Sequence, residues 1–439
     1  MMAGLRDLLQ RIPAKRLLGQ SFSYMVINIL VAFGPLLLIP FLTRVISPDS
    51  YGVYGNFLAT VAVLGVLLGL NTDIMVRRHG HDSVGKLKEW ILASLSVVGT
   101  MTFLALGLVF VVNIWWPQLL DVVGVPFHYM MFAVVCGALT VLFNLSNFIA
   151  TMRENLLVYS WMRIGSTVLF VGLAFVFFLG LRGVVGDIML ARGVSLFAAA
   201  GFGLWWLWRL GAVGFIGPWR AAWGRIPASL RYGLPLLPSI FYDPFMTLIN
   251  RMALTHHQTL GEVGQYTLAY QLAQPLQLLS GSVGIALFPH MVRWFDENTP
   301  ATHKRFLITG AVTFVFLSVV WFGYAVITLP WILPWIGGSS YLNAAPLVAP
   351  LALAFVVGGL AVVLANRYFH NGQTWWISVC CLLGLGINFL LCQMLPTLHG
   401  VAWALVIGYS ATCLWLGLGL MSGKALCFWR WCARTSSIG

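Results

Sequence analysis

The stretch Leu42–Gly55, LTRVISPDSYGVYG, separates two long apolar runs and decides how the chain folds. Pro48 fixes one backbone angle, and Asp49 and Ser50 favour turns. The apolar runs on either side of this joint are each long enough to cross a bilayer. The stretch therefore predicts two membrane-spanning helices folded back on each other, with Arg44 at the end of the first one.

The composition of the chain excludes a water-soluble globular protein. Of its 439 residues, 60% are hydrophobic and only 8% are charged, whereas a water-facing surface needs far more charge. Long apolar runs recur along the whole chain, which favours a bundle of helices over a barrel of short alternating strands. We therefore expect an all-α integral membrane protein.

The formal net charge of +13 raises the alternative of nucleic-acid binding. The lysines and arginines stand between the apolar runs, however, where they act as topology signals that face anionic lipid headgroups. With the N-terminus placed in the cytoplasm, only Arg44, Arg182 and Arg251 fall on the outer side, and Arg163 and Arg192 fall within spans. We expect both termini inside, membrane lipids as partners and no nucleic acid.

Windows of about 20 residues predict twelve membrane-spanning helices. Their expected ranges are 17–42, 51–76, 89–113, 127–151, 156–181, 185–209, 229–251, 263–290, 306–329, 343–366, 374–395 and 398–421. The connections are short and leave no room for an extramembrane catalytic domain. The expected parts are an N-terminal six-helix lobe (1–210), a cytoplasmic inter-lobe loop (211–228), a C-terminal six-helix lobe (229–421) and a basic cytoplasmic tail (422–439).

The two halves of the chain look related. Gly52-Val53-Tyr54 opens the second span, and Gly264-Gln265-Tyr266 opens the eighth. Both hairpins begin inside, so the halves would be parallel repeats with the substrate between them. Chance similarity among apolar helices is the alternative.

Several motifs of enzymes and ATP-driven transporters are missing from the sequence. It contains no GxxxxGK[ST], no HExxH and no GxSxG. The seven cysteines lie in apolar runs or in the basic tail, and we interpret them as small hydrophobic residues. We expect no cofactor, no metal ion and no enzymatic activity.

Ionisable groups inside spans are the sharpest functional signal, since a charge within the bilayer costs several kcal/mol unless it faces protein or water. Arg163 lies in span five, Arg192 in span six and Asp243 near the middle of span seven. Span seven also carries three prolines, which bend or interrupt a helix. For the two arginines, an internal ion pair with Asp243 or Asp187 is the alternative to a ligand.

Polar side chains also recur at helical spacing on two other spans. Asn144 and Asn147 belong to a stripe on span four, and Tyr270 and Gln274 to one on span eight. Hydrogen bonds between helices are the alternative role for each stripe. Arginine suits phosphate oxygens, and tyrosine, asparagine and glutamine suit sugar hydroxyls. Together these residues favour a wet, cationic cavity for an anionic, sugar-bearing amphiphile.

The stretch from Thr43 to Tyr54, TRVISPDSYGVY, resembles the signature that follows the first helix of the Wzx-like polysaccharide-biosynthesis flippases. The stretch from Gly69 to Arg77, GLNTDIMVR, resembles the end of their second helix. These oligosaccharide flippases belong to the multidrug/oligosaccharidyl-lipid/polysaccharide exporter superfamily. The resemblance implies two six-helix lobes that form a MATE-like V and alternate between inward-open and outward-open forms.

The resemblance also implies an activity and a location. A flippase of this kind moves an undecaprenyl-diphosphate-linked oligosaccharide, such as an O-antigen repeat unit, across the bacterial inner membrane. Polymerase and chain-length proteins of the same pathway are candidate partners. The alternatives are a multidrug or small-solute antiporter of the same fold, and a membrane polysaccharide polymerase or ligase.

We assign roles to individual residues on the physical argument alone. The expected substrate-binding residues are Arg163, Arg192, Asn144, Asn147, Tyr270 and Gln274. Asp243 is the candidate ion-coupling group, because a carboxylate within the membrane can change charge when it binds a proton or a cation. Arg44 and Arg251 are the expected gate or rim residues on the outer side.

Overall fold

The computed structural model describes residues 14–80, 82–180, 185–214, 218–297, 299–337 and 339–422. Within these ranges the chain forms helices and no strand. Twelve of the helices have 20 residues or more, which confirms the all-α fold and matches the predicted number of long helices. These helices are α2 (Ala14–Val45), α3 (Pro48–Leu67), α5 (Val84–Trp115), α7 (Phe127–Met152), α8 (Leu156–Gly180), α9 (Val185–Arg209), α10 (Trp219–His257), α11 (Leu260–Glu297), α12 (Pro300–Ile327), α14 (Ala345–His370), α15 (Thr374–Met394) and α16 (Leu398–Ser422).

Short helical segments connect some of these long helices. They are α4 (Asp73–Arg78), α6 (Gln118–Val123), α13 (Leu333–Gly337), the π-helical η1 (Thr328–Ile332) and the 3₁₀-helical η2 (Ser339–Ala344). Ten helices of the described part are long and apolar enough to cross a membrane. The other two long helices, α10 and α11, are more polar, and α10 contains four prolines. The protein is therefore a multi-pass membrane protein.

The joint between α2 and α3 forms as the sequence predicts. Helix α2 ends at Val45, and Pro48 begins α3, where its missing N–H costs no hydrogen bond. The Ser47 hydroxyl caps α3 by accepting from the backbone N–H of Ser50 at 3.3 Å. Pro48 and the Ser47 cap thus fix the place where the chain turns back.

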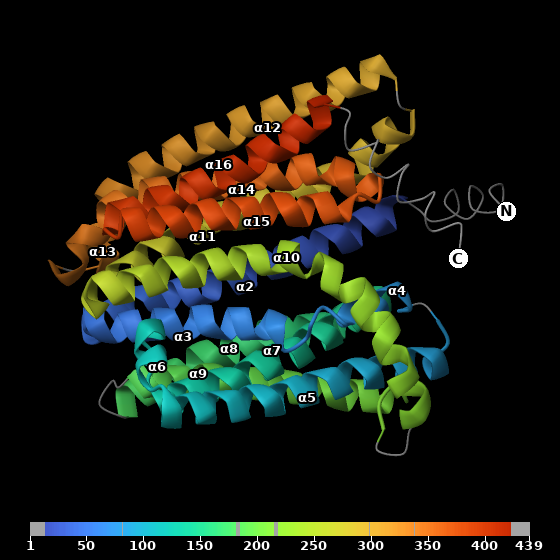
Figure 1. The fold of residues 1–439 in the computed structure, drawn as a ribbon, viewed down its shortest axis with the longest axis horizontal. Coiled ribbons are helices and arrows are strands. Elements are labelled where there is room, and N and C mark those ends of the chain that lie inside the picture. Colours follow the sequence, from blue (N-terminus) through green and yellow to red (C-terminus); the bar gives the residue numbers. More distant parts are fainter. Residues whose placement is uncertain are drawn as a thin grey trace.

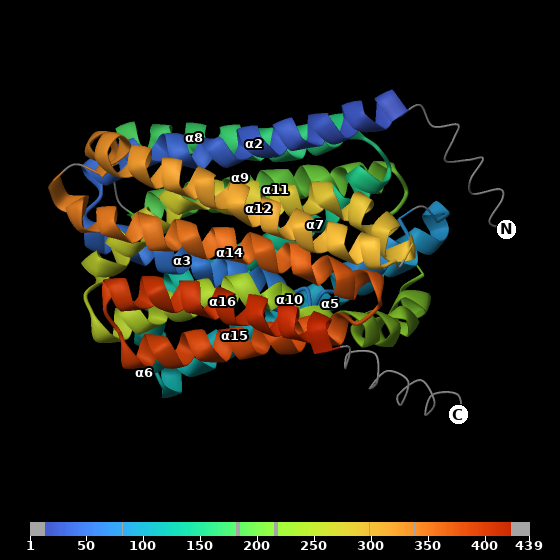
Figure 2. The ribbon, with the colours of Figure 1, turned by 90° about the horizontal axis from the view of Figure 1, so that it is seen from above.

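The long helices form two bundles (Figure 1). In the first bundle α7 packs against α3 and α9, and α8 packs against α2 and α9. In the second, α14 packs against α11 and α16, and α15 packs against α10 and α16. Figure 2 shows that the helices of both bundles run in nearly the same direction. The bundles meet along α3 and α11, and the proposed residue limits of the two lobes stay predictions.

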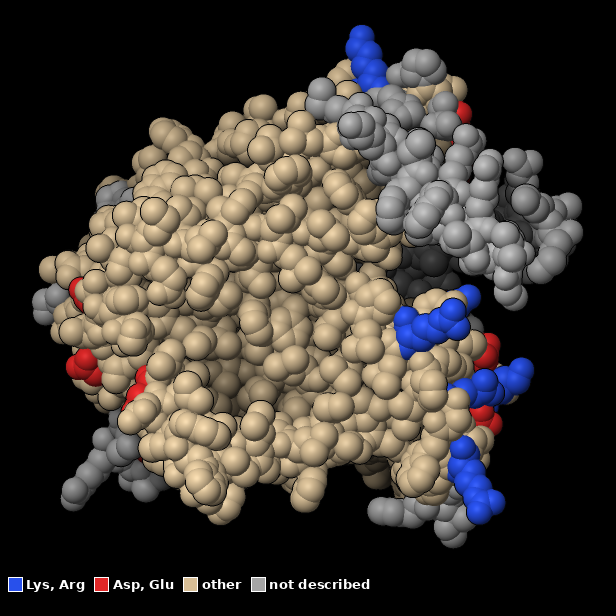
Figure 3. Space-filling model, viewed as in Figure 1, with Lys and Arg blue, Asp and Glu red and all other residues tan. Residues whose placement is uncertain are grey.

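The two ends of the molecule differ in charge. On the face seen in Figure 3, lysines and arginines gather at the end where the described part of α2 begins and α16 ends. We call this the basic end, and we call the opposite end, with Pro48 and Leu260, the hairpin end. The distribution of basic residues assigns the basic end to the cytoplasm. Arg182 and residues 423–439 of the predicted basic tail lie outside the described residues.

Two predicted segments differ from the structure. The predicted loop 211–228 is partly helical, because α10 already begins at Trp219. Its first part lies against α5, where the guanidinium of Arg225 donates to the Glu89 carboxylate at 3.1 Å. The predicted second span is interrupted after Leu67, because Leu70 and Asn71 adopt left-handed backbone angles with φ of 44° and 54°. The spans were predicted from hydropathy, and hydropathy indicates neither the early start of α10 nor the break after Leu67.

The bundles approach most closely where α3 crosses α11 at the hairpin end. A Cβ atom on Gly264 would collide with the Pro48 carbonyl oxygen, and one on Gly52 would collide with the Leu260 carbonyl oxygen. Glycine is therefore required at both positions for this spacing of the backbones. The Gly-x-Tyr triplets of the two halves thus lie at the contact between the bundles, and the relation of the halves stays a prediction.

Replacing Gly264 with alanine should destabilise this structure by about 1–3 kcal/mol, because the added methyl group forces α3 and α11 apart. Thermal unfolding of the purified protein in detergent measures the effect. Gly281→Ala, in the same helix, is the matched control because nothing lies within 4 Å of a Cβ atom built there. Equal melting temperatures for the two variants would contradict the close packing.

Candidate functional site

Asp243 lies in the interior of α10 and has an exposed side chain. The hydroxyl of Tyr409, on α16, donates to its Oδ1 at 2.7 Å. Gln277, on α11, also faces this carboxyl group. Since a carboxylate that faces lipid would cost several kcal/mol, these polar neighbours of the second bundle indicate that Asp243 faces protein or water and not lipid. Figure 3 shows that the face it draws is hollowed between the two bundles.

Asp243, Thr247 and Asn250 recur at helical spacing and form a polar stripe on α10, and the last two are joined to tyrosines of α11. Thr247 and Tyr270 lie 2.9 Å apart through their hydroxyl oxygens. The Asn250 amide nitrogen donates to the Tyr266 hydroxyl at 3.0 Å. Hydrogen bonds between helices therefore do explain this stripe in part. Tyr270 is buried, whereas Gln274, one turn further along α11, is exposed.

Arg251 is buried behind the same tyrosines, with 4% of its surface exposed. Its guanidinium donates to the Thr267 hydroxyl and to the Thr247 carbonyl, each at 3.4 Å. The guanidinium carbon lies 5.0 Å from the centre of the Tyr270 ring, within the range of a cation–π contact. The sequence predicts Arg251 as a gate or rim residue; in the structure α10 continues to His257, and the Arg251 side chain is buried. Its role at the gate stays a prediction.

The arginines of the first bundle have aromatic neighbours. The guanidinium carbon of Arg163 lies 5.5 Å from the ring of Phe143, and its Nε is buried without a hydrogen-bond partner. The guanidinium carbon of Arg192 lies 5.4 Å from the ring of Phe170. Both arginines are half-buried. In the described ranges, neither has a carboxylate within 4.0 Å.

The internal ion pairs that the sequence left open are therefore not formed in this structure. Asp243 receives the Tyr409 hydroxyl, and the Asp187 Oδ2 is buried without a hydrogen-bond partner among the described residues. Two half-buried cationic groups thus remain without a counter-ion in the part of the chain that the structure describes. A bound anion would supply one.

The polar side chains of the stripe on α7 donate hydrogen bonds within their own helix. Thr140, Asn147 and Thr151 each donate to the backbone carbonyl four residues earlier, at 2.8–2.9 Å. The Oδ1 of Asn147 is buried without a partner, and Asn144 is half-buried. Within the described residues, these side chains make no hydrogen bond to another helix, so that alternative does not account for the stripe.

Arg44 lies at the hairpin end, where the bundles meet. It is exposed and donates to the Trp335 carbonyl of α13 at 3.2 Å. The neighbouring Thr43 hydroxyl contacts the Ile336 carbonyl, and Tyr341 donates to the Ile46 carbonyl at 3.0 Å. The end of α2 is thus attached to α13 and η2 of the second bundle.

Two further hydrogen bonds join the bundles near the glycine contact. Asn56, on α3, donates to the Thr255 hydroxyl at 2.9 Å, and the Tyr51 hydroxyl bonds to the Gln271 side chain. Neither partner could be assigned from the sequence, because the pairs are about 200 residues apart. Tyr409 was also missed, since a single tyrosine in an apolar helix gives no signal of its partner.

The predicted site residues therefore form two groups. Arg163, Arg192, Asn144 and Asn147 belong to the first bundle, and Asp243, Arg251, Tyr270 and Gln274 belong to the second. No hydrogen bond between described residues joins one group to the other. The groups can act on one ligand only if it occupies the space between the bundles.

Several solved structures share this fold. An "inward-facing conformation of a multidrug resistance MATE family transporter of the MOP superfamily" has a TM-score of 0.66 and 16% identity, with 92% of this chain and 98% of that chain covered. The "lipid II flippase MurJ, inward closed conformation" has a TM-score of 0.66 and 13% identity, with 92% and 87% covered. The multidrug transporter DinF-BH in complex with R6G has a TM-score of 0.66 and 17% identity, with 95% and 97% covered.

No curated protein matches the sequence significantly. The family model described as "Polysaccharide biosynthesis protein" matches residues 17–295, which is more than half of the chain. The structural neighbours show that the chain shares its fold with a MATE family transporter and with the flippase MurJ. The chain therefore belongs to the polysaccharide biosynthesis protein family, whose fold is that of membrane transporters and flippases.

Proposed function

We propose that this protein is a flippase for an undecaprenyl-diphosphate-linked oligosaccharide, such as an O-antigen repeat unit, in the bacterial inner membrane. It moves the lipid from the cytoplasmic to the periplasmic leaflet by alternating access and changes no covalent bond. The family and the structural neighbour MurJ, a lipid II flippase, support a lipid-linked substrate.

The observation that carries this proposal is that two arginines of the first bundle have no carboxylate partner among the described residues. Arg163 and Arg192 lie within membrane-length helices, and neither has a carboxylate within 4.0 Å in the described ranges. Guanidinium groups bind phosphate oxygens through paired N–H donors. A diphosphate would supply the missing negative charge, and Asn144, Asn147, Tyr270 and Gln274 would offer hydrogen bonds to sugar hydroxyls.

The contacts between the bundles support a direction of entry. Helices α11, α13 and η2 contact the first bundle at the hairpin end, whereas at the basic end the start of α10 contacts α4 and α5. The headgroup would enter from the basic end, beside the start of α10, while the prenyl chain stays in the lipid. The N-terminal and C-terminal lobes, proposed as 1–210 and 229–421, would then rock to open the hairpin end. Arg44, attached to α13, and Arg251, buried behind Tyr270, would belong to the outer gate.

Asp243 is the proposed ion-coupling group. Its exposed carboxylate can bind a proton or a cation, and the Tyr409 hydroxyl at 2.7 Å holds it in place. Loading and unloading of this group would change the charge of the cavity and so bias the two forms.

A multidrug antiporter of the same fold is the second candidate. Asp243 favours it, because an exposed carboxylate in a membrane cavity can bind a cationic drug. The arginines argue against it, since two unpaired guanidinium groups would repel the same cation.

Protein reconstituted in lipid vesicles should move the lipid-linked oligosaccharide between leaflets and should not accumulate a cationic dye. A lectin or an impermeant glycosidase added outside measures the sugar that becomes accessible. Vesicles without protein are the control. Dye accumulation without lipid movement would contradict the flippase and support the multidrug antiporter.

Arg163→Gln and Arg192→Gln should each lower the affinity for the lipid-linked substrate about tenfold or more, because a charge-assisted hydrogen bond to phosphate is lost. Substrate binding and transport by purified protein measure this effect. Arg305→Gln, exposed at the start of α12, is the matched control for the loss of one positive charge. Unchanged binding in both variants, or loss of folded protein in both, would contradict the assigned role.

Asp243→Asn should abolish the dependence of transport on the ion gradient, because the amide cannot change charge but still accepts a hydrogen bond from Tyr409. Transport rates with and without an imposed gradient measure this dependence. Tyr409→Phe removes the hydrogen bond and keeps the carboxylate, so transport by this variant should still depend on the ion gradient. Equal gradient dependence in Asp243→Asn and the wild type would exclude Asp243 as the coupling group.

A further inference from the structure

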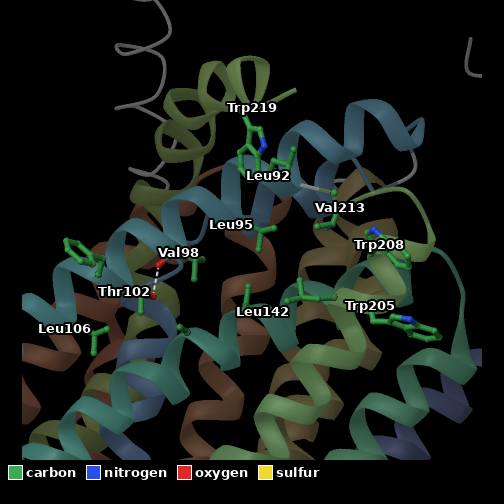
Figure 4. Close-up of a pocket in the computed structure, with 15 residues that line it drawn as sticks. Leu92, Leu95, Val98, Thr102, Leu106, Leu142, Trp205, Trp208, Val213 and Trp219 are labelled. Carbon is green, nitrogen blue, oxygen red and sulfur yellow. Dashed lines mark hydrogen bonds between the residues drawn. The ribbon is translucent and has the colours of Figure 1, made fainter. Parts of the chain in front are cut away.

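A pocket of about 720 Å³ opens on the flank of the first bundle and contains none of the predicted site residues. Figure 4 shows its lining, which comes from α5, α7, α9 and the start of α10. The pocket extends along α5 from Leu92 to Leu106, which corresponds to about 21 Å at the rise of an α-helix. This length suits an extended hydrocarbon chain better than a compact solute.

The lining of the pocket has no free hydroxyl. Thr102 supplies the one hydroxyl, and it donates to the Val98 carbonyl of its own helix at 2.6 Å. Leu95 and Leu142 form part of the floor and walls. Apart from the indole N–H groups of the tryptophans, a polar ligand would therefore find no free side-chain hydrogen-bond partner in this lining, whereas a hydrocarbon chain needs none.

Three tryptophans line the pocket, and two of them are followed in the chain by an arginine. Trp208 and Trp219 line it, and each is followed directly by an exposed arginine, Arg209 and Arg220. The guanidinium carbon of Arg209 lies 4.9 Å from the centre of the Trp205 ring. Tryptophan rings lie at the level of lipid headgroups, and basic residues there attract anionic lipids. Charge and apolar surface thus match the two parts of one amphiphile.

We propose that this pocket binds one anionic phospholipid of the cytoplasmic leaflet, with an acyl chain along α5 and the phosphate between Arg209 and Arg220. A chain held in a concave pocket contacts protein on several sides, unlike a lipid on a convex helix surface. The prenyl chain of the transported substrate fits less well, because its diphosphate would then lie on the flank and away from Arg163 and Arg192.

A lipid in this pocket would affect how the start of α10 is held against the first bundle. The pocket lies where α9 ends and α10 begins, and α10 leads into the second bundle. A lipid that contacts both Trp208 and Trp219 would bind the start of α10 to the first bundle. This inference does not depend on what the protein transports.

A pocket-filling substitution tests the acyl-chain site. Gly99 lines the pocket, and nothing lies within 4 Å of a Cβ atom built there, so Gly99→Phe fills the pocket without a backbone clash. Gly107→Phe is the matched control, because Gly107 lies on the same helix outside the pocket and has equally open surroundings. Native mass spectrometry of delipidated protein titrated with phosphatidylglycerol counts the bound lipids.

The wild type and Gly107→Phe should each retain one tightly bound phosphatidylglycerol. Gly99→Phe should bind it about tenfold more weakly, since displacing about two methylene groups from the pocket is sufficient for such a loss. Equal binding by the two phenylalanine variants would overturn the proposal. Competition for the pocket by the lipid-linked oligosaccharide, lost in Gly99→Phe, would assign the pocket to the substrate instead.

Substitution of these two arginines tests the headgroup site. Arg209→Gln combined with Arg220→Gln should weaken phosphatidylglycerol binding about thirtyfold and leave the weaker binding of phosphatidylcholine unchanged. Lys304→Gln combined with Arg305→Gln, both exposed on the second bundle, controls for the loss of two positive charges. Equal binding of the two lipids by the wild type would overturn the proposed preference for an anionic headgroup.

Discussion

The close approach of α3 and α11 holds the two bundles together at one end. Gly52 and Gly264 leave no room for a side chain where the two helices cross. Asn56 and Thr255, and Tyr341 and the Ile46 carbonyl, add hydrogen bonds at the same end. Packed contacts of this kind are either formed or broken, so this end can act as a gate with two states.

The arrangement of the two bundles bears on the charged residues inside the long helices. Arg163 and Arg192 in the first bundle and Asp243 in the second have no partner of opposite charge in the described ranges. Groups of this kind are costly in a membrane unless water or a ligand reaches them. A space between the two bundles would supply both, and on the proposed function it would explain why the chain keeps these charges.

Much of the fold could be predicted from the sequence, because hydropathy and turn residues act locally. Pro48 and the Ser47 cap explain why the first hairpin was placed correctly. The start of α10 at Trp219 and the break at Leu70 and Asn71 were missed, since both depend on how α10 packs on the first bundle. A Cβ atom on Gly233, in α10, would lie 2.7 Å from the Leu70 carbonyl oxygen. The sequence predicted the site residues as polar faces of separate helices. The partners of these residues, such as Tyr409 for Asp243, could be identified only from the tertiary structure.

The most direct test of this account is to lock the gate reversibly. In a chain whose native cysteines are replaced, Asn56→Cys and Thr255→Cys place two thiols across the contact, where the native side chains are 2.9 Å apart. A short, cleavable thiol cross-linker should stop movement of the lipid-linked oligosaccharide in vesicles, and reduction should restore it. Equal transport before and after cleavage of the cross-link would contradict the gate.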